Sequence, residues 1–202
     1  MILHALLIGA LVGVVVGSLG AGGGIVSVPI LVYVLGQDPH QATGLSLIIV
    51  GLTAAVSLAT RARSGSVAWP EGTIFAFAGL AGTWAGAALT GFLTGFFGVG
   101  GGFAIVPALH LALRYPMKRA SATSLLVMVI TAAFGLASRT IAGTLTITAE
   151  AGVMVALFTA ASMGGGIVGA MFTKRVSNRV LGLVFAALLV CVAASTLVAT
   201  LV

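Results

Sequence analysis

Residues 13–29 read GVVVGSLGAGGGIVSVP, and residues 91–107 read GFLTGFFGVGGGFAIVP. The second stretch begins 78 positions after the first and aligns with it without a gap. The two copies share six glycines and end on the same Val-Pro pair. The chain is therefore an internal duplication, and each half opens on a glycine-rich break inside an apolar run.

The composition around these breaks is that of a membrane protein. Hydrophobic residues make up 60% of the 202 residues and charged residues only 6%, whereas a soluble domain has about 25% charged residues. The net charge is +6, but the basic residues stand in short clusters between apolar runs, as topology signals do. The chain is therefore predicted to lie in a lipid bilayer and not to bind nucleic acid.

The duplication continues beyond the breaks. At the same offset, Thr53-Ala54-Ala55 aligns with Thr131-Ala132-Ala133, and Arg61 aligns with Arg139. A chance match would not hold one register over so many positions. We predict one integral membrane domain made of two repeats. The first repeat, residues 1–90, has a broken helix and two spans, and the second, residues 91–202, has a broken helix and three spans.

The lengths of the apolar runs predict an all-α polytopic membrane protein, because a transmembrane helix needs about 20 largely apolar residues. About seven spanning elements are expected. They are residues 2–36, 40–60, 73–90, 91–114, 118–138, 150–171 and 178–200. The last of them has no counterpart in the first half.

The basic residues orient this arrangement. With seven crossings, eight of the nine lysines and arginines fall on one side, and Arg139 falls on the other. The positive-inside rule makes the side with eight the cytoplasmic side, which predicts a cytoplasmic N-terminus and an external C-terminus. Three crossings separate the two copies, so the repeats are expected to be inverted, a common plan of secondary transporters. If each broken element were instead a hairpin, the split would be six against three, which fits less well.

The glycine triplets are the first candidate site. Each glycine in a helix interior costs about 1 kcal/mol relative to alanine, and non-helical backbone at membrane depth needs protein or a wet cavity around it. A helix that restarts after the break begins with unpaired N–H groups, which attract anions. Two facing breaks would aim two such ends at one point. The spaced glycines, by contrast, predict close helix packing; they are Gly9, Gly13 and Gly17, and the pairs Gly82/Gly86 and Gly165/Gly169.

A stripe of hydroxyl residues is the second candidate. Thr43, Ser46, Thr53, Ser57 and Thr60 follow one helix face. Two interpretations stay open: the hydroxyls line a polar path for an oxyanion, or they bond to helix backbones. The residues nearest the breaks are the preferred candidates. The predicted substrate-binding residues are Gly22, Gly23, Gly24, Thr43, Ser46, Gly100, Gly101, Gly102, Ser121, Thr123 and Ser124.

Ionisable groups add little to this list. Asp38, Glu71 and Glu150 stand at predicted span ends, so no buried carboxylate is evident for a proton relay. Arg61 and Arg139 form a matched pair that either guards two mouths or anchors helix ends, and anchoring is favoured. The sequence has no catalytic constellation and no metal-ligand cluster, so we predict no enzyme activity, no metal and no cofactor.

The two motifs resemble those of the sulfite exporter TauE/SafE family of membrane permeases. The resemblance rests on GSLGAGGGIVSVP and GFFGVGGGFAIVP and on the segments that follow, ATGLSL and ASATSL, and it covers nearly the whole chain. It implies transport of sulfite, sulfonates or related sulfur-containing anions across the cytoplasmic membrane. It also implies that the glycine triplets and the Thr43/Ser46 and Ser121/Ser124 regions face the substrate. Members of that family typically have about eight spans, and here the first repeat lacks the span that matches residues 178–200.

Together these features predict a secondary transporter for a small anion, working by alternating access between the two glycine-broken helices. The alternatives are a non-transporting membrane scaffold or partner subunit, and a passive anion channel. The sequence leaves the substrate, the direction, proton coupling and homo-oligomer formation open.

Overall fold

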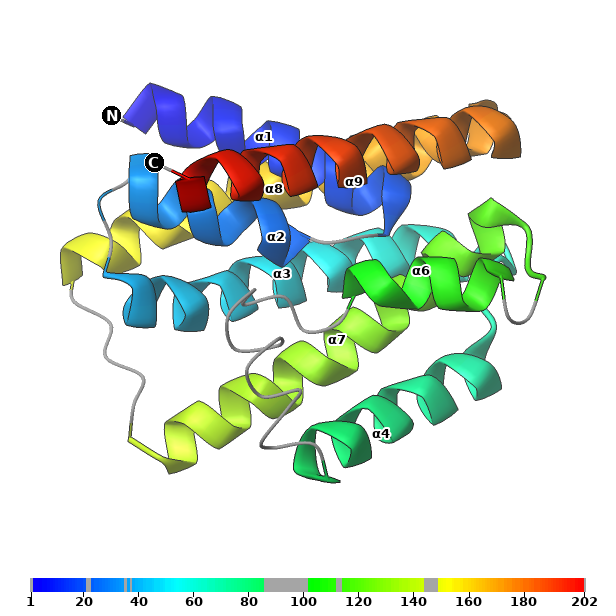
Figure 1. The fold of residues 1–202 in the computed structure, drawn as a ribbon, viewed down its shortest axis with the longest axis horizontal. Helices are drawn as coiled ribbons and strands as arrows, with labels where there is room; N and C mark the ends of the chain where they lie inside the picture. Colours follow the sequence, from blue (N-terminus) through cyan, green and yellow to red (C-terminus); the bar gives the residue numbers. More distant parts are fainter. Residues whose placement is uncertain are drawn as a thin grey trace.

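The chain folds into helices whose ends follow its apolar runs. The computed structural model describes residues 2–20, 23–34, 36, 38–85, 102–111, 114–143 and 149–201, and the predicted all-α class is confirmed (Figure 1). The elements are α1 (Ile2–Leu19), α2 (Gly23–Pro29), the π-helical η1 (Ile30–Val34), α3 (Pro39–Ala62), α4 (Trp69–Ala85), α6 (Gly102–Leu111), α7 (Met117–Ile141), α8 (Ala149–Arg175) and α9 (Asn178–Leu201).

Proline and glycine set several of these boundaries. Pro39 and Pro70 stand in the first turns of α3 and α4, where a missing N–H costs nothing. Pro29 is the last residue of α2, and the chain continues as the π-helical η1, because proline cannot donate the regular helical hydrogen bond. Gly20 has a φ of 62° and follows the last residue of α1, a left-handed conformation that favours glycine at a helix end.

Within the described residues, three helical segments are long and apolar enough to cross a membrane by length and composition. They are Gln41–Ala62, Met117–Ile141 and Gly152–Arg175. Two shorter apolar segments are Leu6–Leu19 and Asn178–Cys191. Large apolar side chains also cover the outside of the bundle; Leu11, Ile74 and Phe77 are more than half exposed. Such an exterior fits the predicted bilayer surroundings.

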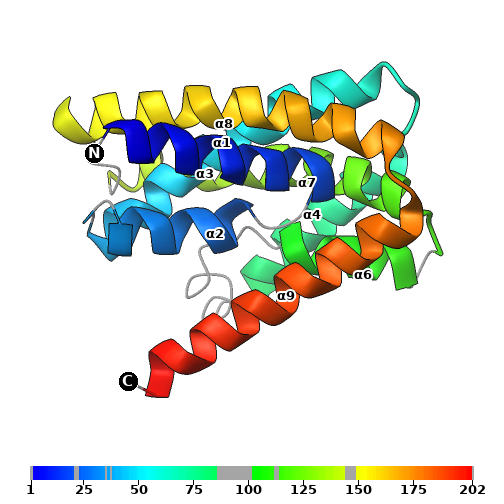
Figure 2. The ribbon, with the colours of Figure 1, turned by 90° about the horizontal axis from the view of Figure 1, so that it is seen from above.

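Helices α1, α3 and α8 run in the same direction. Along α1 and α8, Ser162 Oγ donates to the Gly9 carbonyl at 2.8 Å, and further on Thr173 Oγ1 donates to the Ser18 carbonyl at 3.0 Å. Along α3 and α8, Ser57 lies against Gly166, and Arg61 contacts Thr173. Because α1 and α3 are parallel, the chain runs back through α2 and η1 between them (Figure 2).

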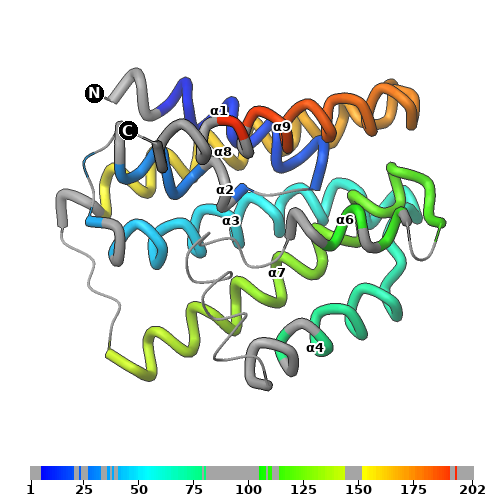
Figure 3. Tube along the Cα trace, in the orientation of Figure 1, coloured from blue at the N-terminus to red at the C-terminus, as the bar shows by residue number. Residues whose placement is uncertain are grey.

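This course corrects two expectations. The prediction that residues 2–36 make one broken crossing is wrong, since α1 and α2 run in opposite directions on the two sides of the break. The start of α1 and the end of α9 lie at the same end of the bundle (Figure 1), whereas the sequence predicted chain ends on opposite sides. The path of the chain along α3, α7 and α8 is traced in Figure 3.

The backbones of α1 and α8 touch, which confirms the predicted packing role of the spaced glycines on these two helices. The pair Gly82/Gly86 extends outside the described residues. A Cβ atom added at Gly13 or at Gly17 would collide with the carbonyl group of Ser162 or Gly166 on α8. From the other side, a Cβ atom at Gly165 would collide with the carbonyl oxygen of Ala10. Small residues allow this approach, and dispersion contacts between the two helices then replace contacts with lipid.

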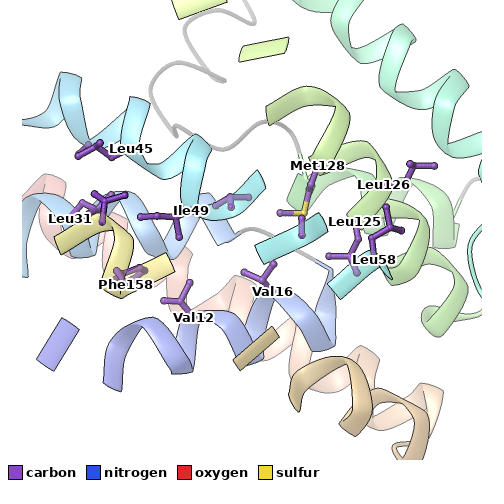
Figure 4. Close-up of a cluster of buried hydrophobic side chains, with 14 of the residues drawn as sticks. Val12, Val16, Leu31, Leu45, Ile49, Leu58, Leu125, Leu126, Met128 and Phe158 are labelled. Atoms are coloured by element: carbon purple, nitrogen blue, oxygen red, sulfur yellow. The ribbon is translucent and has the colours of Figure 1, made fainter. Parts of the chain in front are cut away.

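Two clusters of buried apolar side chains hold the helices together. The larger one joins α1, α3, α7 and α8, and Figure 4 shows Val16, Ile49, Leu125 and Phe158 pointing into it. The smaller cluster joins α6 and α9 through side chains such as Leu109 and Phe185. The first glycine break lies beside the larger cluster, because Val16 is in the last turn of α1.

Candidate functional site

The first glycine break is held by side chains from other helices. The last carbonyl groups of a helix have no intrahelical donor, and α1 ends at Leu19. Arg61 Nη2 donates to the carbonyl oxygens of Gly17, at 2.5 Å, and Ser18, at 2.9 Å. Ser124 Oγ donates to the carbonyl oxygen of Gly20 at 2.5 Å. Side chains of α3 and α7 therefore cap the end of α1.

Arg61 lies at the centre of the junction that the end of α1 forms with α3, α7 and α8. Its side chain is 3% exposed; Nη1 donates to Ser121 Oγ and Nη2 to Thr173 Oγ1, both at 2.7 Å. The acceptors that the structure gives this guanidinium are all neutral oxygens, supplied by α1, α7 and α8. These hydrogen bonds agree with the anchoring interpretation of Arg61. Burying an ion without an opposite charge still costs several kcal/mol, so capping alone does not explain why a charged side chain is buried at this position.

The second arginine of the matched pair makes the reciprocal contact. Arg139 Nη2 donates to Thr43 Oγ1 at 2.9 Å. The repeat offset turns Arg61 into Arg139 and Ser121 into Thr43. Each arginine, near the end of its helix, therefore reaches the hydroxyl near the start of the other helix. This contact pattern makes α3 and α7 antiparallel neighbours.

The predicted hydroxyl residues divide between the two ends of this antiparallel pair. Ser121 and Ser124 lie at the first break, and Thr123 Oγ1 accepts a hydrogen bond from the Ala68 N–H at 3.1 Å. Thr43 and Ser46 lie at the opposite end, where Ser46 Oγ donates to the Thr43 carbonyl at 2.8 Å. The structure therefore keeps these two sets of hydroxyl residues apart and does not bring them together into one cluster.

The glycine triplets are only partly within the described residues. Gly22, Gly100 and Gly101 lie outside them, whereas Gly23 and Gly102 are the first residues of α2 and α6. Gly24 is the second residue of α2. A Cβ atom at Gly23 would lie 2.6 Å from Val16 Cγ2 and 3.1 Å from Val50 Cγ2. The start of α2 is thus packed tightly between α1 and α3.

Sequence reasoning gave too little weight to one face of α3. Thr53, Ser57 and Arg61 are buried, and Thr53 Oγ1, Ser57 Oγ and Arg61 Nε find no hydrogen-bond partner among the residues the structure describes. Buried polar atoms without partners are rare and need an explanation. The signal in the sequence was the regular step of four between a threonine, a serine and an arginine.

Tyr115, which packs against the smaller apolar cluster, links α4 to the segment before α7. Its hydroxyl donates to Glu71 Oε1 at 2.7 Å, and this hydrogen bond lowers the pKa of Glu71 and raises the pKa of Tyr115. The Arg119 guanidinium stacks 4.5 Å above the centre of the Tyr115 ring. Among the described residues, no group of three or more His, Cys, Asp or Glu side chains could hold a metal ion.

Ser124→Ala is expected to lower the melting temperature of the protein. The substitution leaves the Gly20 carbonyl without its side-chain donor, and an unsatisfied buried acceptor costs about 1–3 kcal/mol. Thr140→Ala is the matched control on the same helix, because that hydroxyl is exposed and donates to the local Ala137 carbonyl. Equal melting temperatures of the two purified variants would contradict the capping role of Ser124.

Comparisons with known proteins bear on the whole chain. Residues 5–90 and 86–196 each match the family model described as sulfite exporter TauE/SafE. A protein of Xylella fastidiosa strain Temecula1, named as a probable membrane transporter protein, is 33% identical over 172 residues, covering 58% of this chain and 66% of the relative. The protein of strain 9a5c with the same name gives the same figures.

A shorter similarity links the chain to an archaeon. A probable membrane transporter protein of Methanocaldococcus jannaschii is 50% identical over 56 residues, which cover 28% of this chain and 21% of that protein. The chain spans just under two thirds, 66%, of the length of the Xylella relatives. No solved structure matches the chain.

Proposed function

The chain belongs to the sulfite exporter TauE/SafE family, a family of membrane transporters rather than enzymes, and we propose that it carries a small anion across the cytoplasmic membrane. Sulfite, a sulfonate or a related sulfur oxyanion is the proposed substrate, moved by alternating access. The observation that carries the proposal is the buried junction at the first glycine break. There a guanidinium and hydroxyl groups from three helices gather, and the acceptors around the guanidinium carry no negative charge.

The proposed architecture is a pair of inverted repeats, residues 1–90 and 91–202. It is supported by the antiparallel packing of α3 against α7 and by the reciprocal contacts Arg61–Ser121 and Arg139–Thr43. A pseudo-twofold axis between α3 and α7 would exchange these two contacts. Inverted repeats of this kind provide two alternative packings of one fold, which is the structural basis of alternating access.

The proposed topology follows from the basic residues and the helix directions. Arg61 contacts Thr173, and Lys118 Nζ donates to the Lys174 carbonyl at 3.2 Å, so three basic clusters share one end of the bundle. The positive-inside rule assigns that end to the cytoplasm. Both described chain ends lie at the opposite end (Figure 1) and are therefore proposed to be external.

The substrate-facing residues proposed from the sequence are the glycine triplets and the hydroxyls beside them. Support comes from the position of Ser121 and Ser124 at the first break and from the tight fit of Gly23 between α1 and α3. A larger side chain at Gly23 would fill the space that the end of α1 and the start of α2 share.

Proteoliposomes containing the purified protein are expected to take up radiolabelled sulfite saturably, and Gly23→Leu is expected to reduce uptake to the level of empty liposomes. Gly182→Leu on α9 is the matched control, because none of the residues that the structure describes comes within 4 Å of a Cβ atom there. Size-exclusion profiles check that each variant is folded. Absence of uptake of sulfite, sulfonates and sulfate by the unaltered protein would contradict the proposed function, and full uptake by Gly23→Leu would contradict the proposed site.

A further inference from the structure

Three residues of α3, each one turn from the next, bury polar atoms that the described structure leaves unpaired. They are Thr53 Oγ1, Ser57 Oγ and Arg61 Nε, and the side chains are 0%, 0% and 3% exposed. Steps of four residues keep side chains on one helix face. The three atoms therefore form a row along α3, and we refer to Thr53, Ser57 and Arg61 as the polar row.

The polar row faces α8 and not the outside of the bundle. A Cβ atom at Gly166 of α8 would lie 2.6 Å from Ser57 Oγ and 3.2 Å from Thr53 Cγ2. Further along the same seam, Arg61 contacts Thr173 of α8. Glycine at position 166 brings α8 against the row, so the row is closed in this structure and opens only when α3 and α8 separate.

The row has the chemistry of an anion site. The guanidinium of Arg61 carries a full positive charge, its acceptors are neutral, and its Nε–H has no partner among the described residues. An oxyanion supplies the missing negative charge and accepts hydrogen bonds from the planar guanidinium and from hydroxyl groups. A carboxylate of the protein would neutralise the arginine permanently, whereas a mobile anion neutralises it only while bound.

The second repeat does not reproduce the row. The positions equivalent to Thr53, Ser57 and Arg61 are Thr131, Gly135 and Arg139. Gly135 has no hydroxyl and packs against the Leu47 side chain, and Thr131 Oγ1 donates to the Val127 carbonyl at 2.9 Å. Within the described residues, the row of three unpaired polar atoms is therefore a feature of α3 and not a by-product of the duplication.

We propose that the polar row binds the transported oxyanion, with Arg61 selecting for negative charge and Ser57 and Thr53 donating to the oxygens of the anion. The inference rests on the proposed transport function and gives it a site on the α3–α8 seam. The same guanidinium caps the Gly17 and Ser18 carbonyls. An anion that draws Arg61 toward the seam therefore weakens the cap on α1, which links binding to the first glycine break.

Ser57→Ala is the most informative variant, since it removes a hydroxyl that has no partner in the described structure. If the hydroxyl has no ligand, its removal leaves the melting temperature unchanged or raises it, and the stabilisation by sulfite stays the same. If it serves the anion, the concentration of sulfite that gives half-maximal thermal stabilisation rises about threefold. Stabilisation is measured on the detergent-purified protein, with chloride at equal ionic strength as the reference.

Arg61→Gln tests the charge. Loss of a charge-assisted hydrogen bond is expected to weaken sulfite binding about tenfold or more. Arg63→Gln, an exposed arginine two residues away, is the control and keeps the unaltered response. If Arg61→Gln does not fold, Ser57→Ala decides the question alone.

The outcomes separate the two proposals. If the unaltered protein transports sulfite and Ser57→Ala and Arg61→Gln keep its KM and stabilisation, the polar row is not the site, and the transport function stands. If sulfite stabilises the protein through the row but no anion is transported, the anion site stands and the transport function falls. Absence of any sulfite-specific stabilisation of the unaltered protein overturns the anion site.

Discussion

Gly20→Ala is expected to abolish the folded protein or lower its melting temperature severely. Gly20 has a φ of 62°, and its Cβ atom would collide with the Ser121 carbonyl oxygen and lie 2.5 Å from Ser124 Oγ. The left-handed backbone alone costs about 1–2 kcal/mol, and a backbone carbonyl in a packed helix cannot move aside cheaply. The total loss is large against a typical stability of about 5–15 kcal/mol.

Gly143→Ala separates the cost of the left-handed backbone from the cost of the steric collision. Gly143 has a φ of 64°, and no described atom lies within 4 Å of a Cβ atom there, so among the described residues the substitution carries only the backbone cost. Yield of monodisperse protein and melting temperature are compared for the two variants. Equal losses would mean that the approach of Gly20 to α7 is not needed, which would contradict the described junction.

Gly165→Ala and Gly164→Ala are expected to change stability in opposite directions, although the two glycines are adjacent on α8. A Cβ atom at Gly165 collides with the Ala10 carbonyl oxygen, so α1 and α8 must move apart along their contact. At Gly164 no atom of the described part of the chain lies within 4 Å of an added Cβ atom, and the alanine gains about 1 kcal/mol of helix propensity. Thermal unfolding in detergent gives both values, and a stabilised Gly165→Ala would contradict the α1–α8 contact.

The sequence predicted those parts of the fold that depend on local pattern and duplication. Apolar run lengths predicted the helices, and the spacing of Gly9, Gly13 and Gly17 predicted a close helix contact without naming the partner helix. The repeat offset paired Arg61 with Arg139 and Ser121 with Thr43. Only the structure adds that Arg61 contacts the Ser121 hydroxyl and that Arg139 contacts the Thr43 hydroxyl.

The direction of the chain after the first break could not be predicted in the same way. Apolar run lengths do not distinguish a helix that bends at a glycine triplet from one that reverses there, because both keep the same residues in lipid. The reversal depends on tertiary contacts, above all the parallel packing of α1 and α3 with α8. Counting 2–36 as one crossing therefore placed the chain ends at opposite ends of the bundle, whereas α1 begins at the end where α9 finishes (Figure 1).

The burial of Arg61 was equally hard to foresee. A basic residue at the end of a predicted span is normally counted as a topology signal. Here the partners of Arg61 are 43 to 112 residues away in the sequence, so no local pattern reports them. For this reason the sequence predicted a site among the hydroxyls near both breaks, whereas the structure points to one face of α3.

Counterflow of sulfite tests the central claim, carriage of a small anion by alternating access, most directly. The uptake of labelled sulfite is compared between proteoliposomes preloaded with unlabelled sulfite and proteoliposomes that contain no sulfite. A carrier that exposes one site alternately to the two sides takes up label faster when the inside holds sulfite, and the protein is predicted to do so. Label uptake that preloading leaves unchanged, or uptake no greater than in protein-free liposomes, would contradict the account.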